Sequence, residues 1–282
     1  MQNNRRPEQR LWRHRCRELC ERPIGIFDSG MGGLTVFSAV RKILPGENII
    51  YFGDTARVPY GTKSKKTVTS FSVEIAEHLV RKNIKLLVVA CNTASSLALK
   101  EIRSRIRVPV IGVIEPGVET ALKETKNKKI LVIATNSTVS SHAYAQMLKK
   151  KSPETEVCEK ACPLFVPLVE EGWCGRQATF MVANEYFAGL KKTGFDTIIL
   201  GCTHYPLLKK VIGKIVGEKV NIIDSARSVA GHVFEALKKN GMFNPGSRGY
   251  SKFIVSDAPE KFSGLAWRLL KIRVRDIKIK RF

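Results

Sequence analysis

The sequence predicts an α/β fold with two similar, doubly wound parallel-sheet subdomains that face each other across a central cleft. Three observations support this prediction. From Ile24 onward, short blocks rich in Ile, Val and Leu alternate with segments of helical periodicity. Several blocks are apolar without interruption, as expected for parallel strands covered by helices on both faces. The chain also repeats the order of strand, polar turn and helix in its two halves.

Nine segments are expected to form strands, with helices between them. The strands are 24–27, 48–52, 85–90, 108–114, 129–134, 155–162, 197–201, 220–223 and 252–255. In segment 65–82, Val68, Phe71, Ile75 and Leu79 recur at helical spacing and share one face, which predicts an amphipathic helix. Alternation of strands and helices is typical of parallel sheets.

The two halves of the chain carry matching strand ends. LLVVACNTAS (86–95) and TIILGCTHYP (197–206) each end a strand at a cysteine, whereas IGIFDSGMGG (24–33) and ILVIATNSTV (130–139) each pass from a strand into a polar turn. We therefore expect a first α/β subdomain of residues 23–114 plus 225–282 and a second of residues 115–224. Residues 1–22 are expected to be a basic, flexible N-terminal extension.

The chain is strongly basic, with 48 Lys and Arg against 25 Asp and Glu and a net charge of +23. Residues 1–22 carry seven Arg and three Glu, and residues 261–282 carry eight Lys or Arg and one Asp. Such a charge attracts anions, so binding of nucleic acid or of a DNA-processing partner is one alternative and a plain solvated surface is the other. No nucleic-acid-binding motif that interleaves aromatic residues accompanies the charge.

The sequence favours a cytoplasmic protein with free thiols. No apolar stretch reaches the length of a membrane span, and the N-terminus lacks the hydrophobic block of a secretory signal. Seven cysteines are spread over a long chain, which is not typical of a disulfide framework. The pairs Cys16–Cys20 and Cys158–Cys162, with His14 and Cys174 nearby, resemble half of a zinc site. Because structural zinc needs four convergent ligands, we predict no metal.

Two cysteines stand where open α/β sheets bind ligands. Cys91 and Cys202 each follow a predicted strand and precede a predicted helix. The N–H groups and dipole of a helix N-terminus are expected to lower the pKa of a thiol from about 8.5 toward neutrality. If the two halves face each other, the thiols approach a ligand from opposite sides. That arrangement suits removal of a proton from one face of a carbon and its return on the other.

Other cysteine chemistries agree less well with the sequence. A phosphatase loop needs an arginine six residues after the nucleophile, where Leu97 and Leu208 stand instead. A hydrolase built on Cys202 and His204 is an alternative, but it leaves Cys91 without a role. The glycines of FDSGMGG do not have the spacing G-x-G-x-x-G, and no lysine is marked as a pyridoxal phosphate anchor. No cofactor is therefore predicted.

Three further polar residues are candidates for the same site. Asp28 ends the first predicted strand and either orients a thiol or caps a turn. His204 either exchanges a proton with Cys202 or packs in the interior. Glu170 is either an acid of the site or a surface residue at a helix end.

Seven segments closely resemble the glutamate racemase family of cofactor-independent amino-acid racemases. They are IGIFDSGMGGLTV (24–36), YFGDTARVPYGTKS (51–64), VVACNTAS (88–95), PVIGVIEPG (109–117), CPLFVPLVEEG (162–172), ILGCTHYPLL (199–208) and SDAPEKF (256–262). The resemblance runs from about Pro23 to Leu270. It implies two α/β subdomains with the active site between them, and interconversion of L- and D-glutamate without a cofactor. The product is expected to supply peptidoglycan synthesis in a bacterial cytoplasm.

The resemblance also implies residue roles. Cys91 matches the thiol that deprotonates D-glutamate, Cys202 matches the thiol that deprotonates L-glutamate, and Asp28, His204 and Glu170 match residues that assist them. Positions that match substrate contacts are Asp28, Ser29, Tyr60, Gly61, Asn92, Thr93, Thr203 and His204. Thr135 and Thr138 match further contacts, although ATNST departs from the usual Gly-Thr-x-x-Thr.

The resemblance leaves some alternatives open. An aspartate racemase or one of broad specificity keeps both thiols and changes only the depth of the pocket. Dimers are common in the family, so we expect a homodimer. Some members inhibit DNA gyrase, which keeps a secondary role with gyrase or nucleic acid open. Residues 1–22 lie outside the resemblance.

Overall fold

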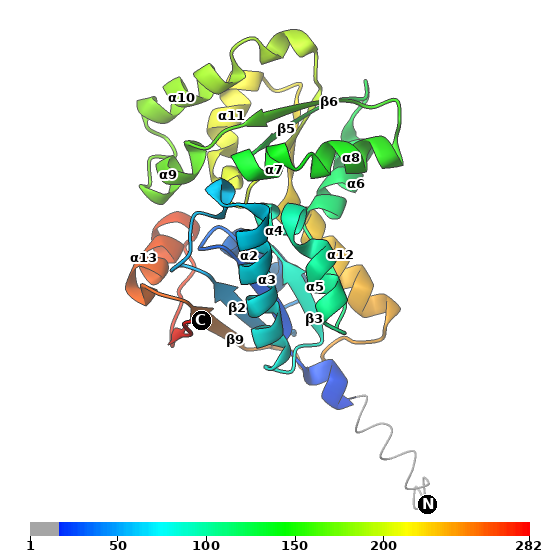
Figure 1. Ribbon diagram of the computed structural model, residues 1–282, viewed down its shortest axis with the longest axis vertical. Helices are drawn as coiled ribbons and strands as arrows, with labels where there is room; N and C mark the ends of the chain where they lie inside the picture. The colour runs from blue at the N-terminus through cyan, green and yellow to red at the C-terminus, as the bar shows by residue number, and fades with distance from the viewer. Residues whose placement is uncertain (1–16) are drawn as a thin grey trace, which may run out of the picture.

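The computed structural model describes residues 17–282, in which two parallel sheets are flanked by helices (Figure 1). Ten strands lie within that range, and they are β1 (Ile24–Asp28), β2 (Ile49–Gly53), β3 (Leu86–Val89), β4 (Val110–Gly112), β5 (Lys129–Ala134), β6 (Glu156–Ala161), β7 (Thr197–Gly201), β8 (Asn221–Asp224), β9 (Ser251–Val255) and β10 (Lys278–Ile279). The predicted α/β class is confirmed. Nine of the strands were predicted; β10 was not, because two residues in a basic segment carry no periodicity.

The helices fill the connections between strands. They are α2 (Leu34–Ile43), α3 (Lys65–Val80), α4 (Asn92–Leu97), α5 (Leu99–Arg105), α6 (Ile114–Glu124), α7 (Asn136–Ser140), α8 (Ala143–Lys151), α9 (Phe165–Glu170), α10 (Gln177–Phe187), α11 (Lys209–Val216), α12 (Ser225–Lys239) and α13 (Pro259–Leu270), with 3₁₀ helices η1 (Tyr60–Thr62), η2 (Leu190–Thr193) and η3 (Tyr205–Leu208). The expected amphipathic helix is α3. Its residues Val68, Ile75 and Leu79 are buried, and Phe71 is partly buried.

Each sheet is parallel throughout the described chain. The larger sheet has the strand order β10-β9-β2-β1-β3-β4, and the smaller has the order β6-β5-β7-β8. In the centre of the larger sheet, Ile24 of β1 pairs with Ile49 of β2 on one side and with Leu86 of β3 on the other. The chain forms β1 to β4, then the whole smaller sheet, and returns to add β9 and β10. The subdomain boundaries 23–114 with 225–282, and 115–224, stay predictions.

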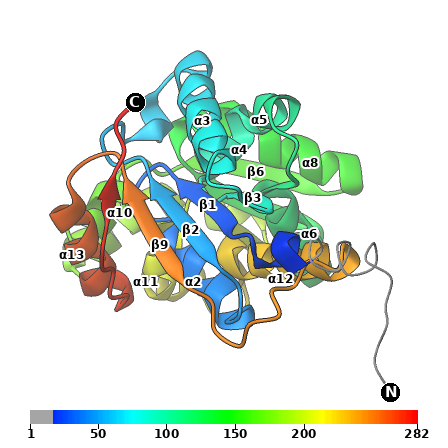
Figure 2. The same cartoon turned by 90° about the horizontal axis from the view of Figure 1, so that it is seen from below.

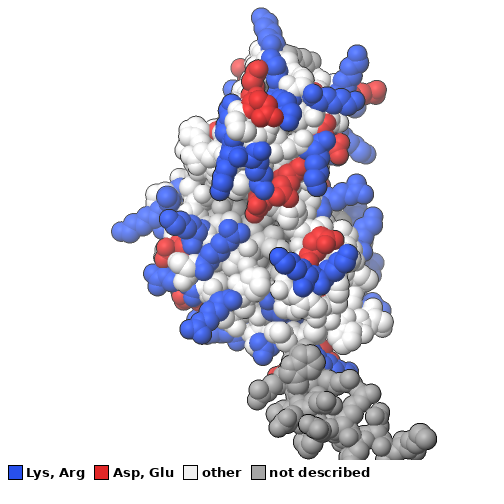
Figure 3. All heavy atoms as spheres, turned by 90° about the vertical axis from the view of Figure 1, so that its right-hand side faces the viewer, with Lys and Arg blue, Asp and Glu red and all other residues white. Residues whose placement is uncertain are grey.

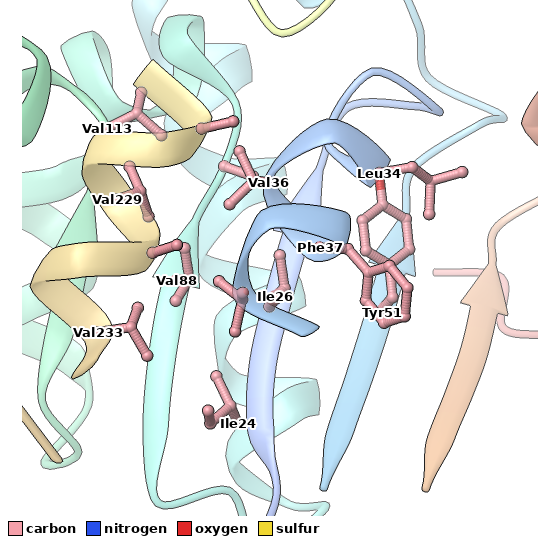
Figure 4. Close-up of a cluster of buried hydrophobic side chains, with 14 of the residues drawn as sticks. Ile24, Ile26, Leu34, Val36, Phe37, Tyr51, Val88, Val113, Val229 and Val233 are labelled. Atoms are coloured by element: carbon pink, nitrogen blue, oxygen red, sulfur yellow. The ribbon is translucent and has the colours of Figure 1, made fainter. Parts of the chain in front are cut away.

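The central strands are buried on both faces, which explains their uninterrupted apolar sequence. Ile26 and Val88 point toward α2 and α12, where Val229 is fully buried (Figure 4). Phe27 and Val89, one residue further along each strand, belong to the layer under α3. Figure 2 shows α2 and α12 on one side of the larger sheet and α3 on the other.

The surface in Figure 3 carries many Lys and Arg side chains with fewer Asp and Glu side chains between them. Within residues 17–282, no helix is long and apolar enough to cross a membrane. In the same range, no three His, Cys, Asp or Glu side chains converge as metal ligands. Cys16, His14 and most of the predicted extension 1–22 lie outside the described residues.

Candidate active site

A cavity of about 340 Å³ lies where the carboxyl ends of the two sheets meet. Its wall combines residues that follow β1, β2 and β3 of the larger sheet with residues that follow β5, β6 and β7 of the smaller one. The lining residues are Ser29, Val58, Pro59, Tyr60, Gly61, Thr62, Cys91, Asn92, Thr93, Thr135, Asn136, Pro163, Val166, Pro167, Glu170, Cys202, Thr203 and His204. Of the predicted site residues, only Asp28 and Thr138 are absent from this lining, and both are buried against residues that line it.

The two candidate thiols enter the cavity from different sheets. Cys91 follows β3 and caps α4, where its Sγ accepts a hydrogen bond from the Ala94 amide at 3.5 Å. Cys202 directly follows β7. Both are free cysteines, and their exposed fractions are 5% and 7%. The two groups are therefore sheltered from bulk water but reachable from the cavity.

The environment of Cys91 favours the protonated thiol. Its Sγ lies 3.6 Å from the Ser29 Oγ. Burial, followed by the charge of Asp28, raises the pKa of Cys91 to about 12, and the bond from the Ala94 amide offsets only part of this rise. The expectation that a helix N-terminus brings this thiol toward neutrality is therefore wrong, because loss of hydration outweighs one hydrogen bond at a helix end.

Cys202 lies next to an acid–imidazole pair. The His204 Nδ1 is 3.9 Å from the Cys202 Sγ, and its Nε2 is 3.1 Å from the Glu170 Oε1. Burial lowers the pKa of His204, but its contacts with Cys202 and Glu170 outweigh burial and raise it to about 10. The hydrogen bond from His204 lowers the pKa of Glu170. An imidazolium therefore stands between the sulfur and a carboxylate.

Asp28 lies behind the cavity wall, in contact with Thr203. It is fully buried at the end of β1, where Oδ2 accepts a hydrogen bond from the Gly30 amide at 3.0 Å and Oδ1 accepts one from the Thr203 hydroxyl at 3.3 Å. Burial raises the pKa of this carboxyl. The glycine-rich turn permits the close packing, since a Cβ on Gly33 would lie 2.4 Å from the Asp28 Cβ.

Three threonine hydroxyls meet beside the cavity. The Oγ1 atoms of Thr93 and Thr135 are 3.0 Å apart, those of Thr135 and Thr138 are 3.0 Å apart, and those of Thr93 and Thr138 are 3.3 Å apart. Thr93 belongs to α4, whereas Thr135 and Thr138 follow β5. Gly61 packs directly on Thr135, where a Cβ would lie 2.7 Å from the threonine Cβ. Such a cluster of donors suits a carboxylate.

Sequence reasoning missed part of the wall. Residues that line the cavity without having been predicted are Val58, Pro59, Thr62, Asn136, Pro163, Val166 and Pro167. All except Asn136 fall inside YFGDTARVPYGTKS or CPLFVPLVEEG, the quoted motifs that also contain Tyr60 and Glu170. Their position in those motifs was the available signal, but all of them except Thr62 are apolar and carry no group that indicates chemistry.

Comparison with known proteins identifies the family to which this chain belongs. Residues 33–233 match the family described as Asp/Glu/Hydantoin racemase. The chain is 51% identical over 255 residues to a glutamate racemase of Geobacter metallireducens, which covers 90% of this chain and 94% of that protein. It is 46% identical over 259 residues to a glutamate racemase of Chlorobaculum tepidum, with 91% and 95% covered. The chain therefore belongs to the Asp/Glu/Hydantoin racemase family.

Solved structures narrow this class. Glutamate racemase from Thermus thermophilus, in complex with beta-chloro-D-alanine, has a TM-score of 0.85 and 44% identity, and covers 93% of this chain and 98% of its own. Glutamate racemase from Francisella tularensis, in complex with D-glutamate, has a TM-score of 0.88 and 38% identity, with 93% and 98% covered. Within its class the chain belongs to the glutamate racemases, and it is an isomerase.

Proposed function

We propose that this enzyme interconverts L- and D-glutamate, with Cys91 and Cys202 as two opposing acid/base groups. The observation that carries the proposal is that these thiols line one cavity from the ends of two different sheets. An α-carbon held between them has one thiol on each face. The related proteins from Francisella tularensis and Thermus thermophilus bind D-glutamate and beta-chloro-D-alanine, which supports an amino-acid substrate for this cavity.

The proton path needs two steps. In the direction from L- to D-glutamate, the Cys202 thiolate, stabilised by the His204 imidazolium, takes the α-proton. The electron pair left on the α-carbon delocalises into the α-carboxylate. The Cys91 thiol then donates its proton to the opposite face, which leaves a thiolate at Cys91 and a thiol at Cys202. The reverse reaction exchanges these roles, and no cofactor is required.

The high pKa of Cys91 agrees with this proposal. In the direction from L- to D-glutamate, the protonated Cys91 thiol is the form that donates the proton to the α-carbon. The ammonium group of the bound substrate adds a positive charge to the cavity, which favours the thiolate when Cys91 has to act as the base. Enclosure from water strengthens that attraction.

The threonine cluster supports glutamate over a shorter substrate. Thr93 and Thr135 offer two hydroxyls that line the cavity for a second carboxylate, and Thr138 lies within hydrogen-bond distance of both. The test is incubation of the protein with L-glutamate, D-glutamate or aspartate in D₂O without cofactor. Exchange of the α-proton together with inversion is expected for both glutamate enantiomers and not for aspartate. A folded, reduced protein that is inert toward glutamate would contradict the proposal.

We further propose that the product feeds peptidoglycan synthesis in the cytoplasm and that the enzyme is a homodimer, as the family resemblance implies. Complementation of a bacterium that requires D-glutamate tests the first point, and sedimentation tests the second.

Binding to DNA or gyrase has only the net charge of +23 in its favour. Loss of salt-sensitive DNA binding on removal of residues 1–22 would support it.

A further inference from the structure

One wall of the cavity is a single short loop. Residues 58–62, here called the rim loop, all line the cavity and include η1. Tyr60 is 2% exposed, and its hydroxyl donates a hydrogen bond to the Asp54 Oδ2 at 2.5 Å. Burial, then Asp54, raises the pKa of Tyr60 well above its usual range, so the phenol keeps its proton and remains a donor. The position of the rim loop therefore depends on Asp54.

The Asp54 carboxylate contacts two side chains besides Tyr60, those of Ser256 and Arg57. It is fully buried just after β2, and its Oδ1 accepts a hydrogen bond from the Ser256 hydroxyl at 2.8 Å. Its Oδ2 is 2.7 Å from the Arg57 Nε. Arg57 also forms an ion pair of 2.6 Å with Glu74 on α3. Because a guanidinium is planar, a change in the orientation of Arg57 alters both contacts at once.

The guanidinium of Arg57 lies between two aromatic rings. Its Cζ is 4.0 Å from the centroid of the Phe71 ring and 4.8 Å from the centroid of the Phe282 ring. The Phe71 ring is in turn 6.0 Å from the ring of Tyr60. Stacking of a cation on aromatic faces fixes its orientation. Two chains of contacts therefore connect Phe282 with Tyr60. One runs through Arg57 and Asp54, and the other runs through Arg57 and Phe71.

Strand β10 brings Phe282 to this place. Ile279 pairs with Val255 of β9, and the Lys280 amide bonds to the Val255 carbonyl at 2.8 Å. Figure 2 shows the red C-terminal segment running beside β9 toward α3, and the Phe282 ring lies 6.0 Å from the ring of His78 in the last turn of that helix. The Phe282 ring also contacts Phe52, at 5.7 Å between centroids, and yet it is 48% exposed. A ring this exposed contributes little to the core.

We infer that Phe282 is a positioning residue for the active site, which fixes the rim loop by stacking on Arg57. Arg57 in turn orients Asp54, and Asp54 holds the hydroxyl of Tyr60. This inference rests on the proposed function for its kinetic consequence, because the rim loop then forms part of the glutamate site. Its structural consequence, a less ordered rim loop when Phe282 is truncated, does not depend on the substrate.

The test compares Phe282→Ala, Phe282→Tyr and Phe282→Leu in the full chain. Loss of the ring is expected to raise KM for both enantiomers about 3- to 10-fold and to change kcat less than about 2-fold, since the thiols are untouched. The tyrosine variant should retain the wild-type KM and the leucine variant should not. Tyr250→Ala is the matched control, because Tyr250 is also exposed and lies 4.7 Å from the Lys252 Nζ, and it should leave KM unchanged.

Hydrogen exchange separates this inference from the proposed function. The amides of Arg57 and Lys63, which bond to Asp54 and Tyr60 at 3.1 Å and 3.0 Å, should exchange faster in Phe282→Ala and in Phe282→Leu than in Phe282→Tyr. That result is expected even if the protein does not act on glutamate. Rescue by leucine as complete as that by tyrosine would overturn the role of stacking. Unchanged KM and unchanged exchange in Phe282→Ala would overturn the whole inference.

Discussion

Thr203 donates a hydrogen bond of 3.3 Å to Asp28 and so joins the end of β7 in the smaller sheet to the end of β1 in the larger one. The next residue after Asp28, Ser29, lies 3.6 Å from the sulfur of Cys91, and Thr203 directly follows Cys202. A contact between the sheets thus lies next to both thiols. The relative position of the sheets therefore sets the spacing of the two thiols.

Removal of either thiol is expected to abolish useful turnover. In Cys91→Ala or Cys202→Ala, one face of the α-carbon has no group to exchange a proton, so kcat should fall by about 10²–10⁴-fold while the fold is retained. Circular dichroism and the appearance of the opposite enantiomer are the measurements. Cys158→Ala, which alters a half-buried thiol outside the cavity, should remain active. Near-normal turnover without Cys91 or Cys202 contradicts the two-thiol mechanism.

The two thiols should differ in reactivity. Burial raises the pKa of Cys91 to about 12 and keeps this thiol protonated at pH 7, whereas Cys202 lies 3.9 Å from the imidazole of His204. Their exposures are similar, so access does not explain a difference. Iodoacetamide at pH 7 is expected to label Cys202 well before Cys91, as followed by mass spectrometry of peptides. Equal rates of labelling would show that the two environments do not differ as described.

Loss of the imidazolium should lower kcat/KM equally in the two directions but change their α-deuterium isotope effects differently. In His204→Gln, kcat/KM should fall about 10²-fold, and equally for both enantiomers because L- and D-glutamate have the same free energy. The asymmetry should appear in the α-deuterium isotope effect, which is expected to rise more for L-glutamate since Cys202 then limits proton removal. His142→Gln is the matched control, because His142 pairs with Glu159 at 2.7 Å outside the cavity. An equal rise for both enantiomers would assign His204 to neither thiol.

Stability should depend on pH through the same histidine. The pKa of His204 is about 10, above its ordinary value of 6.5. Its contribution to the free energy of unfolding is therefore complete below pH 6.5 and is lost as the pH rises through 10. Urea unfolding at pH 6.5 and pH 10 should show a larger fall in the free energy of unfolding for wild type than for His204→Gln. Other groups that titrate near pH 10 are common to both proteins, so the difference isolates His204. Parallel curves would mean that the imidazolium does not stabilise the fold.

Much of the fold follows from local patterns in the sequence. Segment 129–134, KILVIA, is apolar and bounded by turn residues, and β5 has those bounds. The expected strand 108–114 is only Val110–Gly112 in the structure, because Ile114 already begins α6. Cys91 and Cys202 were placed at strand ends by the repeat, and the structure brings both to one cavity.

Properties that depend on burial and on distant contacts were not accessible from the sequence. The pKa of Cys91 is set by how completely the surrounding chain excludes water, which no neighbouring residue type reveals. The stacking of Phe282 on Arg57 joins residues 225 positions apart. Local periodicity carries no information about such pairs. For the same reason the apolar wall formed by Pro163 and Val166 was missed.

A single hydroxyl should control how firmly the rim loop is held. The Ser137 hydroxyl on α7 shares its one proton between the carbonyls of Gly61, at 2.8 Å, and Lys63, at 3.2 Å, so it connects the smaller sheet's side of the cavity with the rim loop. Ser137→Ala removes both bonds, and a net value of about 0.5–1.5 kcal/mol predicts a KM for glutamate about 2- to 10-fold higher, with a smaller change in kcat. Ser140→Ala, at an exposed position on the same helix, is the control and should leave KM unchanged. The measurement is KM and kcat of both variants with each enantiomer, from steady-state kinetics. An unchanged KM in Ser137→Ala would show that the rim loop keeps its place without this contact.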